Sequence, residues 1–378
     1  MEALLATDEV QRTPTVQGLI AITKSRLLRE AGDLAGAIAI SQQALANLPK
    51  QELLLRARIT LNLAIAHYLQ GELSAADQLL TETITTGHTA QLLGPLPTIY
   101  IKVQILRAQG NLQQARRLCQ DGVDLITRNK WQDSPAVGFL HVTMGELLRE
   151  CNELSAAAQY LESGIRLGQS GGHHHILIIG HVWLAWLRQA EGDVTAGQEN
   201  IRAALQLVEQ HALSRFWPMP SAACTQVRLW IAQGNLTAAN HWAQSTGLNW
   251  DAAQIPFLDE AAYMTAARLR IAEGSLDVAK SLLSRLYQAA VAVGRNGSLI
   301  EILILQAITY AAQKQREQAI AVLTQALSLA GPEGYVRLFV DEGETLRLLI
   351  LDLRFTITDV ALAKLYRSIV GRVCRAIQ

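Results

Sequence analysis

Residues 103–115, VQILRAQGNLQQA, contain the arrangement that decides the fold, because its features recur along the chain. At its centre, Gly110, Asn111 and Leu112 form a short turn mark. Glycine suits the left-handed backbone that ends one helix, and Asp, Asn or Ser at the next position can cap the following helix. Each mark therefore predicts a joint between two helices. Marks about 40 residues apart begin at Gly32, Gly71, Gly110, Asn152, Gly192, Gly234, Gly274 and, in degenerate form, Lys314.

Small residues keep fixed distances from these marks. Five residues after each mark stand Ala37, Ala76, Ala115, Ala157, Gly197, Ala239, Ala279 and Ala319. Seven residues before it stand Ser25, Ala64, Val103, Gly145, Ala185, Val227, Ala267 and Ala307. Matched small positions let two antiparallel helices pack closely, and the offsets resemble the tetratricopeptide pattern. We expect leucine at Ala115 or Ala239 to overpack this contact.

The pattern predicts an all-α fold, a right-handed superhelical solenoid of about eight tetratricopeptide-like repeats. The repeats cover residues 15–331, after an N-terminal segment at residues 1–14. Stacked helix pairs share one core and leave a concave surface, which the first helix of each pair should line. Residues 332–378 leave the pattern and predict a C-terminal cap: an extended or irregular YVRLFV segment and one or two helices.

Composition excludes several classes of function. The chain has 33 basic and 33 acidic residues, so no strong field favours nucleic acid or an anionic membrane. Its N-terminus does not resemble a signal peptide and no segment is long and apolar enough to span a membrane, which predicts a cytoplasmic protein. The cysteines, Cys119, Cys151, Cys224 and Cys374, are far apart and read as reduced thiols.

Two stretches resemble hallmarks of a known family. They are PAVGFLHVTMGELLRECNELSAAAQYLESGIRLG at residues 135–168 and GYVRLFVDEGE at residues 334–344. Both resemble the sensor region of MalT-like, LuxR-type transcriptional regulators, which are large ATP-dependent bacterial switch proteins of the STAND class. The resemblance extends over nearly the whole chain. It implies that the solenoid binds an inducer and partner domains, and that binding releases the other modules for activation.

In such regulators an ATPase module precedes the helical region and a helix-turn-helix domain that reads DNA follows it. The chain has no GxxxxGK[ST] loop, so we expect no nucleotide cofactor in it. Residues 355–378 are too few for the DNA-binding domain, so direct nucleic acid binding is not expected. The chain looks like an excised sensor domain. It also lacks GxSxG, HExxH and paired carboxylate motifs, which predicts a protein that is not an enzyme.

Groove residues are predicted from their distance to the turn marks. Positions three, six and ten residues before a mark should face the concavity, and Arg, Gln, Tyr and Trp there could bind carboxylates, hydroxyls or rings. The ligand-groove candidates are Tyr100, Gln104, Arg107, Glu146, Arg149, Trp186, Gln189 and Arg228. The same offsets mark Arg26, Arg29, Tyr68 and Arg268. The alternative is that these are ordinary solvated residues of the inner face. As solvated arginines, Arg107 and Arg149 should matter for binding and little for stability.

A rival function is a generic tetratricopeptide scaffold that takes a peptide in its groove. The inspected positions hold Arg and Gln but no Asn or Lys, which disfavours a peptide-backbone ladder. Six tryptophans cluster in the fifth and sixth repeats, where Trp230 and Trp242 should belong to the core rather than to a ligand cage. The run His173–His175 predicts a surface loop, because no Cys or carboxylate nearby completes a metal site. His67 and His141 should make buried hydrogen bonds.

Overall fold

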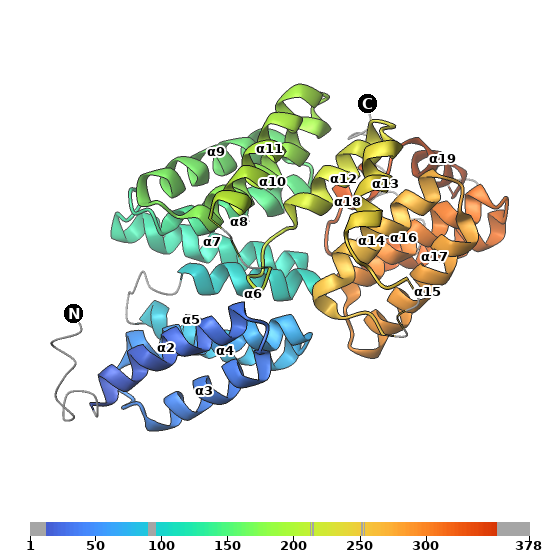
Figure 1. Ribbon diagram of the computed structural model, residues 1–378. Coiled ribbons are helices and arrows are strands. Elements are labelled where there is room, and N and C mark those ends of the chain that lie inside the picture. Colours follow the sequence, from blue (N-terminus) through green and yellow to red (C-terminus); the bar gives the residue numbers. More distant parts are fainter. Residues whose placement is uncertain are drawn as a thin grey trace.

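The computed structural model describes residues 13–353 except residues 90–95, 212, 214, 251 and 253, and within this part of the chain it contains helices and no strand (Figure 1). Eight helix pairs follow one another, which confirms the predicted all-α solenoid. The pairs are α2 (Pro14–Glu30) and α3 (Leu34–Asn47), α4 (Leu53–Gln70) and α5 (Leu73–Thr89), α6 (Leu96–Ala108) and α7 (Leu112–Asn129), α8 (Val137–Glu150) and α9 (Leu154–Gly171), α10 (His174–Ala190) and α11 (Val194–Gln210), α12 (Ala222–Ala232) and α13 (Leu236–Ser245), α14 (Glu260–Ala272) and α15 (Leu276–Ala292), and α16 (Asn296–Ala312) and α17 (Arg316–Ala330).

The turn marks end the first helix of each pair as predicted. All eight adopt the left-handed conformation, with φ of 88° at Gly32, 64° at Asn152 and 60° even at the degenerate Lys314. Asp33, Asp193 and Asn235 then cap the second helix, since their side chains accept a hydrogen bond from a backbone N–H three residues on. The side chains of Asn111 and Ser275 make no such bond, so the capping prediction is wrong for these two marks.

The small positions lie where the paired helices meet. All the predicted alanines after the marks, from Ala37 to Ala319, have 0% exposure. At Gly145, a Cβ atom would lie 2.6 Å from the side chain of Leu161, so even alanine would not fit between α8 and α9. Close approach of the two helices in each pair therefore depends on these residues.

Successive turns of the superhelix touch each other along what we call the seam. Each turn mark of an early repeat contacts the residues that lead into a first helix five repeats later. A Cβ atom on the glycine would lie about 3 Å from the opposite residue in the pairs Gly32 with Phe216, Gly71 with Phe257, and Gly110 with Asn296. In Figure 1, α6 lies between the α2–α5 pairs and the α8–α11 pairs, and α16 lies beside it.

The C-terminal segment continues the seam after the last repeat. Arg337 donates a hydrogen bond of 3.2 Å to the side chain of Asn152, the fourth turn mark. The predicted extended or irregular YVRLFV segment is wrong in one respect, because Arg337–Val340 forms a short helix, α18. Its branched and aromatic residues suggested an extended chain, but contacts with α8 override this local preference. Helix α19 (Glu344–Leu353) follows and packs on α16 and α17. The rest of the predicted cap, with Cys374, lies outside the described residues.

Candidate functional site

Three predicted groove residues from two neighbouring repeats contact each other directly. Gln104 and Arg107 lie on α6, and Glu146 lies on α8. The side-chain amide of Gln104 donates to one oxygen of Glu146 at 3.1 Å. Arg107 forms an ion pair with the other oxygen and donates to Gln104 at 3.2 Å. The three side chains therefore form a closed polar triad on the first helices of the third and fourth repeats.

Two tryptophans of α10 extend this triad toward the later repeats. The guanidinium of Arg107 lies 5.3 Å from the ring centre of Trp183, and that of Arg149 lies 5.9 Å from it. Trp186 receives Arg149 at 5.4 Å and Arg228 at 4.5 Å. Arginines within about 6 Å of an indole face are attracted by the negative ring surface. The tryptophans thus connect arginines from α6, α8 and α12.

Carboxylates from the eighth repeat and from the C-terminal segment neutralise the remaining arginines. Arg149 pairs with Asp341. On α14, Arg268 pairs with Glu301 of α16 at 2.7 Å and with Glu342. We call the whole assembly the central ion-pair cluster; it consists of Gln104, Arg107, Glu146, Arg149, Trp183, Trp186, Arg228, Arg268, Glu301, Arg337, Asp341 and Glu342.

Burial of this cluster contradicts the expectation of a solvated inner face. Glu146 has 1% exposure, Arg149 3% and Arg268 7%. The side chains of Arg107 and Arg228 remain 23% and 22% exposed, so these two are the most accessible of its arginines. The chain's own segment 335–343 fills the face here. The repeat offsets could not predict this, because the segment lies outside the repeats. Arg149 is therefore not a solvated residue, which contradicts the premise from which we expected it to matter little for stability.

Burial and pairing shift the acidities of the carboxyl groups in opposite directions. Burial raises the pKa of Glu146 despite Arg107, and it raises the pKa of Glu150 to about 7 against the opposing effect of Arg149. At Asp341, burial also disfavours the charged form, but Arg149 and Arg337 outweigh it and hold the pKa below its usual value. Asp341 of the C-terminal segment is therefore ionised at neutral pH.

Two of the predicted groove residues lie apart from the cluster. Tyr100 is fully buried, packs at 6.0 Å from the ring of Phe139, and its hydroxyl has no hydrogen-bond partner among the described residues. Gln189 accepts a hydrogen bond of 3.3 Å from Gln233 at the exposed edge of the next repeat. The structure thus brings together six of the eight candidates, while their role in binding a ligand stays a prediction.

Sequence reasoning missed the acidic half of the cluster. Glu301, Asp341 and Glu342 provide carboxylates to the arginines, but Glu301 lies 13 residues before its mark and the other two lie outside the repeats. A usable signal was present, because the GYVRLFVDEGE stretch was distinctive and acidic while the predicted groove was rich in arginine. Trp183, nine residues before its mark, carried no such signal.

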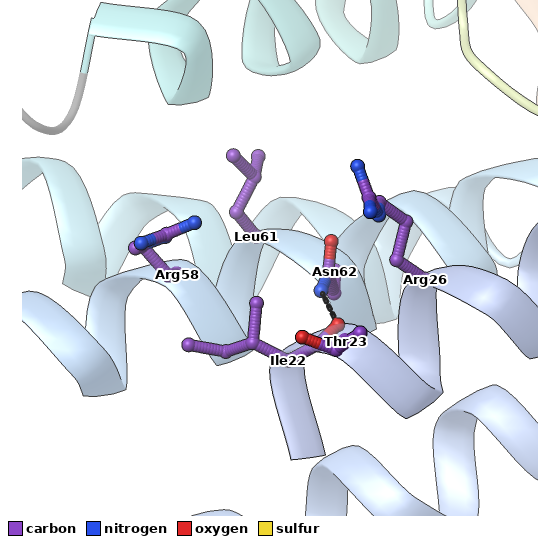
Figure 2. Close-up of a pocket in the computed structure, with 6 residues that line it drawn as sticks. All are labelled: Ile22, Thr23, Arg26, Arg58, Leu61 and Asn62. Carbon is purple, nitrogen blue, oxygen red and sulfur yellow. Dashed lines mark hydrogen bonds between the residues drawn. The ribbon is translucent and has the colours of Figure 1, made fainter. Parts of the chain in front are cut away.

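A hollow opens on the same face in the first two repeats. It has a volume of about 250 Å³ and is lined by Ile22, Thr23, Arg26, Arg58, Leu61 and Asn62. Figure 2 shows the two arginines on either side of Leu61 and Asn62, and the Asn62 amide donates to the Ile22 carbonyl at 3.1 Å. Ile22, Arg26 and Leu61 occupy predicted groove positions. The hollow therefore combines two guanidinium groups with two apolar side chains, Ile22 and Leu61, and two polar ones, Thr23 and Asn62.

The histidine run is not a surface loop. His173 is exposed, but α10 begins at His174, whose ring stacks on that of His211 at 3.4 Å. His175 packs 4.8 Å from the ring of Trp217, and burial lowers its pKa to about 4. The prediction was wrong because Gly171 and Gly172 end α9 so tightly that the next helix begins at once. Among the described residues, no three His, Cys, Asp or Glu side chains are grouped so as to hold a metal ion.

The structure also places the other residues that the sequence analysis singled out. Trp230 and Trp242 pack against a core cluster of α12, α13 and α14, as predicted. His141 is half-buried with the Ser163 hydroxyl 3.1 Å from its Nδ1, and His67 contacts Glu72. Cys119, Cys151 and Cys224 are free thiols. None of the described helices is both long and apolar enough to cross a membrane.

Full-length bacterial regulators are similar to this chain over most of its length. The HTH-type transcriptional regulator MalT of Vibrio campbellii is 25% identical over 300 residues, which are 78% of this chain and 32% of the relative. MalT of Serratia proteamaculans is 24% identical over 91% of this chain and 38% of the relative. MalT of Yersinia enterocolitica is 27% identical over 85% of this chain and 35% of the relative. The chain thus spans about a third of the length of the curated relatives it matches.

Among solved structures, a Rap protein complexed with Competence and Sporulation Factor has a TM-score of 0.52 at 10% identity, over 84% of this chain and 98% of that one. At this identity the likeness concerns the helical-repeat fold alone. The family model described as the MalT-like TPR region matches residues 18–354, which include every helix pair of the solenoid except the first residues of α2. The chain therefore belongs to the family of MalT-like TPR regions.

Proposed function

We propose that this chain is the effector-sensing and autoregulatory domain of a MalT-like, LuxR-type regulator, and that it binds a small-molecule inducer and partner domains through its concave face. The observation that carries the proposal is the central ion-pair cluster, which joins the first helices of six repeats to the C-terminal segment. A solenoid that serves only as a scaffold needs an apolar core. Buried ion pairs contribute little net stability, because removing charges from water costs as much as pairing them gains.

The cluster is suited to transmit a binding event. Because its members come from α6, α8, α10, α12, α14, α16 and α18, a ligand that displaces one arginine changes the balance of charge across six repeats. A ligand shifts a protein between two arrangements by as much as its affinity for them differs. A local contact can therefore bias the arrangement of the whole superhelix.

The test is a thermal-shift screen of the chain with sugars, small metabolites and short peptides. A ligand that prefers the folded state raises Tm, because it adds about 2.7 kcal/mol to the free energy of unfolding at a concentration of 100 times its Kd. The proposal expects a small molecule among the hits. If peptides alone raise Tm, the chain is a generic peptide-binding scaffold and the small-molecule part of the proposal is wrong.

Matched variants then locate the site of a hit. Arg107→Gln removes the accessible arginine of the cluster, and Arg26→Gln removes one from the hollow in Figure 2. Arg166→Gln on the exposed face of α9 is the control. We expect the Kd to rise at least tenfold in one of the first two variants and to be unchanged in the control. Equal affinity in all three would place the site away from the concave face.

A further inference from the structure

The C-terminal segment lies on the inner face of the solenoid in the manner of a bound peptide. We infer that the face formed by α8, α12 and α14 is a binding site for an acidic peptide segment of a partner domain, and that residues 335–343 of the chain occupy this site as an internal ligand. This inference rests on the proposed function in one respect, namely that partner domains bind the concave face. It adds the chemistry of the partner and the occupant that the partner must displace.

Backbone contacts hold the segment as they would hold a peptide. The N–H of Val336 donates to the backbone carbonyl of Glu150 at 3.2 Å, and the N–H of Leu338 donates to the Glu150 carboxylate at 3.0 Å. Phe339 has 1% exposure and serves as an apolar anchor between them and the acidic end. Main-chain bonds and one buried ring are the usual elements of peptide recognition, since they provide affinity and register.

Two adjacent carboxylates complete the recognition. Asp341 pairs with Arg149, and Glu342 accepts from Nε of Arg268 at 2.9 Å. Arginine is suited to this because its planar fork binds a carboxylate through two donors. The contacts therefore select a segment in which an Asp-Glu pair follows an aromatic residue.

The solenoid without the segment is left with excess positive charge. On its side of the contact, four arginines (Arg107, Arg149, Arg228 and Arg268) face at most three carboxylates, those of Glu146, Glu150 and Glu301, and burial raises the pKa of Glu150 to about 7. The segment contributes Arg337, Asp341 and Glu342, a net charge of −1 that opposes this positive excess. Without it, Arg149 has no ion-pair partner within the described residues and keeps its tryptophan contacts and a weaker attraction to Glu146 and Glu150. A site of this charge attracts an acidic segment from outside.

The segment can leave without dismantling a repeat. It occupies the place along the seam where the first helix of a ninth repeat would begin, as the contact between Arg337 and Asn152 shows. However, it contains only the four-residue helix α18, whereas the eight repeats before it are complete pairs. Segments with few local contacts open at lower free energy than the core of the fold. Exchange for a partner segment is therefore possible while α8, α12 and α14 stay folded.

The experiment adds the segment in trans. A fluorescently labelled peptide of residues 334–344, GYVRLFVDEGE, is titrated into the full chain and into the D341N/E342Q double variant, and binding is followed by anisotropy. We expect the peptide to bind the double variant at least tenfold more tightly than the unaltered chain, because the internal ligand of the variant has lost its charges. The control peptide GYVRLFVNQGE should bind at least tenfold more weakly. Absence of binding to a variant that circular dichroism shows to be folded overturns the inference.

Hydrogen exchange on the unaltered chain provides a second test, which holds even if the double variant does not fold. The amides of Val336 and Leu338 should exchange at least tenfold faster than that of Leu147, which is buried in α8. Equal rates would mean that the segment opens only with global unfolding, which also overturns the inference. A small-molecule hit in the thermal-shift screen together with a negative peptide titration leaves the proposed function standing and rejects the internal ligand alone.

Discussion

Arg149 was predicted as a ligand-binding residue of the groove, but its side chain is buried in the central ion-pair cluster. Its guanidinium pairs with Asp341 and lies over Trp183 and Trp186, with almost no contact with solvent. Removing one member of a buried ion pair leaves the other charge uncompensated in a medium of low polarity, which costs more than the pair contributes. The energetic role of such a residue is thus visible only when its partner is taken away.

We predict that Arg149→Ala lowers the free energy of unfolding by about 3–5 kcal/mol, because it leaves Asp341 buried beside Arg337 alone. The exposed Arg215→Ala, which breaks a surface pair with Asp259, should cost about 0–1 kcal/mol. Urea denaturation measures both. A loss at Arg149 no larger than that at Arg215 would show that Asp341 finds another partner or that the segment has moved away.

Glu150 provides a prediction about pH. Burial raises its pKa to about 7 in the folded chain, against about 4.3 in an unfolded chain. Between these values the folded state binds more protons than the unfolded one, so the contribution of Glu150 to stability is present at low pH and is lost as the pH rises through 7. Glutamine stays neutral, and its carbonyl can still accept from the N–H of Leu338.

The stability difference between Glu150→Gln and the unaltered chain should therefore grow in favour of the variant, from near zero at pH 4.5 to about 4 kcal/mol above pH 7. Urea denaturation of both proteins at several pH values gives this difference. His175, whose burial lowers its pKa to about 4, acts in the opposite direction, but it is common to both proteins and cancels. A difference that does not change with pH would contradict the assignment.

At the scale of helices, the contact within each pair depends on one slim position. Ala115 and Ala239 have 0% exposure, and each lies five residues after its turn mark on the second helix. In α17, Ala319 is equally buried, whereas Ala321 faces solvent. The same substitution can therefore be compared at buried and exposed positions of second helices.

We predict that Ala115→Leu or Ala239→Leu costs about 1–3 kcal/mol, because the added methylenes force α7 from α6 or α13 from α12. Ala321→Leu should leave the midpoint of urea denaturation nearly unchanged, since leucine is almost as good a helix former as alanine. If the buried and exposed substitutions have the same effect, the register of the repeats is not set by these alanines.

The seam decides the properties of the whole molecule, because it converts an open superhelix into one whose turns support each other. The ring of Tyr68 meets that of Phe257 at 5.2 Å, edge to face, although the two belong to the second and seventh repeats. Arg29, in the first repeat, donates to the backbone carbonyl of Phe216 before the sixth. A change of pitch must break these contacts, so the seam limits the superhelix to few arrangements.

We predict that Gly297→Ala opens the seam between α6 and α16. A Cβ atom there would lie 1.9 Å from the backbone carbonyl oxygen of Arg107, which cannot rotate away. The variant should melt at a lower temperature and show a larger radius of gyration in small-angle X-ray scattering. Gly18→Ala in α2 is the control, because its nearest neighbour at 3.1 Å is the flexible end of Leu48. Unchanged dimensions in Gly297→Ala would mean that the turns are not held in contact there.

The helix pairs and their turns could be predicted from the sequence. Eight turn marks with small residues at fixed offsets specified the helix pairs, because left-handed glycine and close helix packing act over a dozen residues and leave a pattern in a single chain. The same offsets selected Arg107, Glu146, Arg149, Trp186 and Arg228, which meet although they come from four repeats.

The surroundings of these residues could not be predicted from the sequence, because they depend on how distant repeats come together. Asp341 and Glu342 come 192 and 74 positions after the arginines they pair with, and no repeat offset connects them. Contact between turns five repeats apart depends on the pitch of the superhelix, which is the accumulated result of every helix packing angle. Small differences in each angle add along the chain, so the filled inner face and the seam follow from the whole fold and from no single stretch of it.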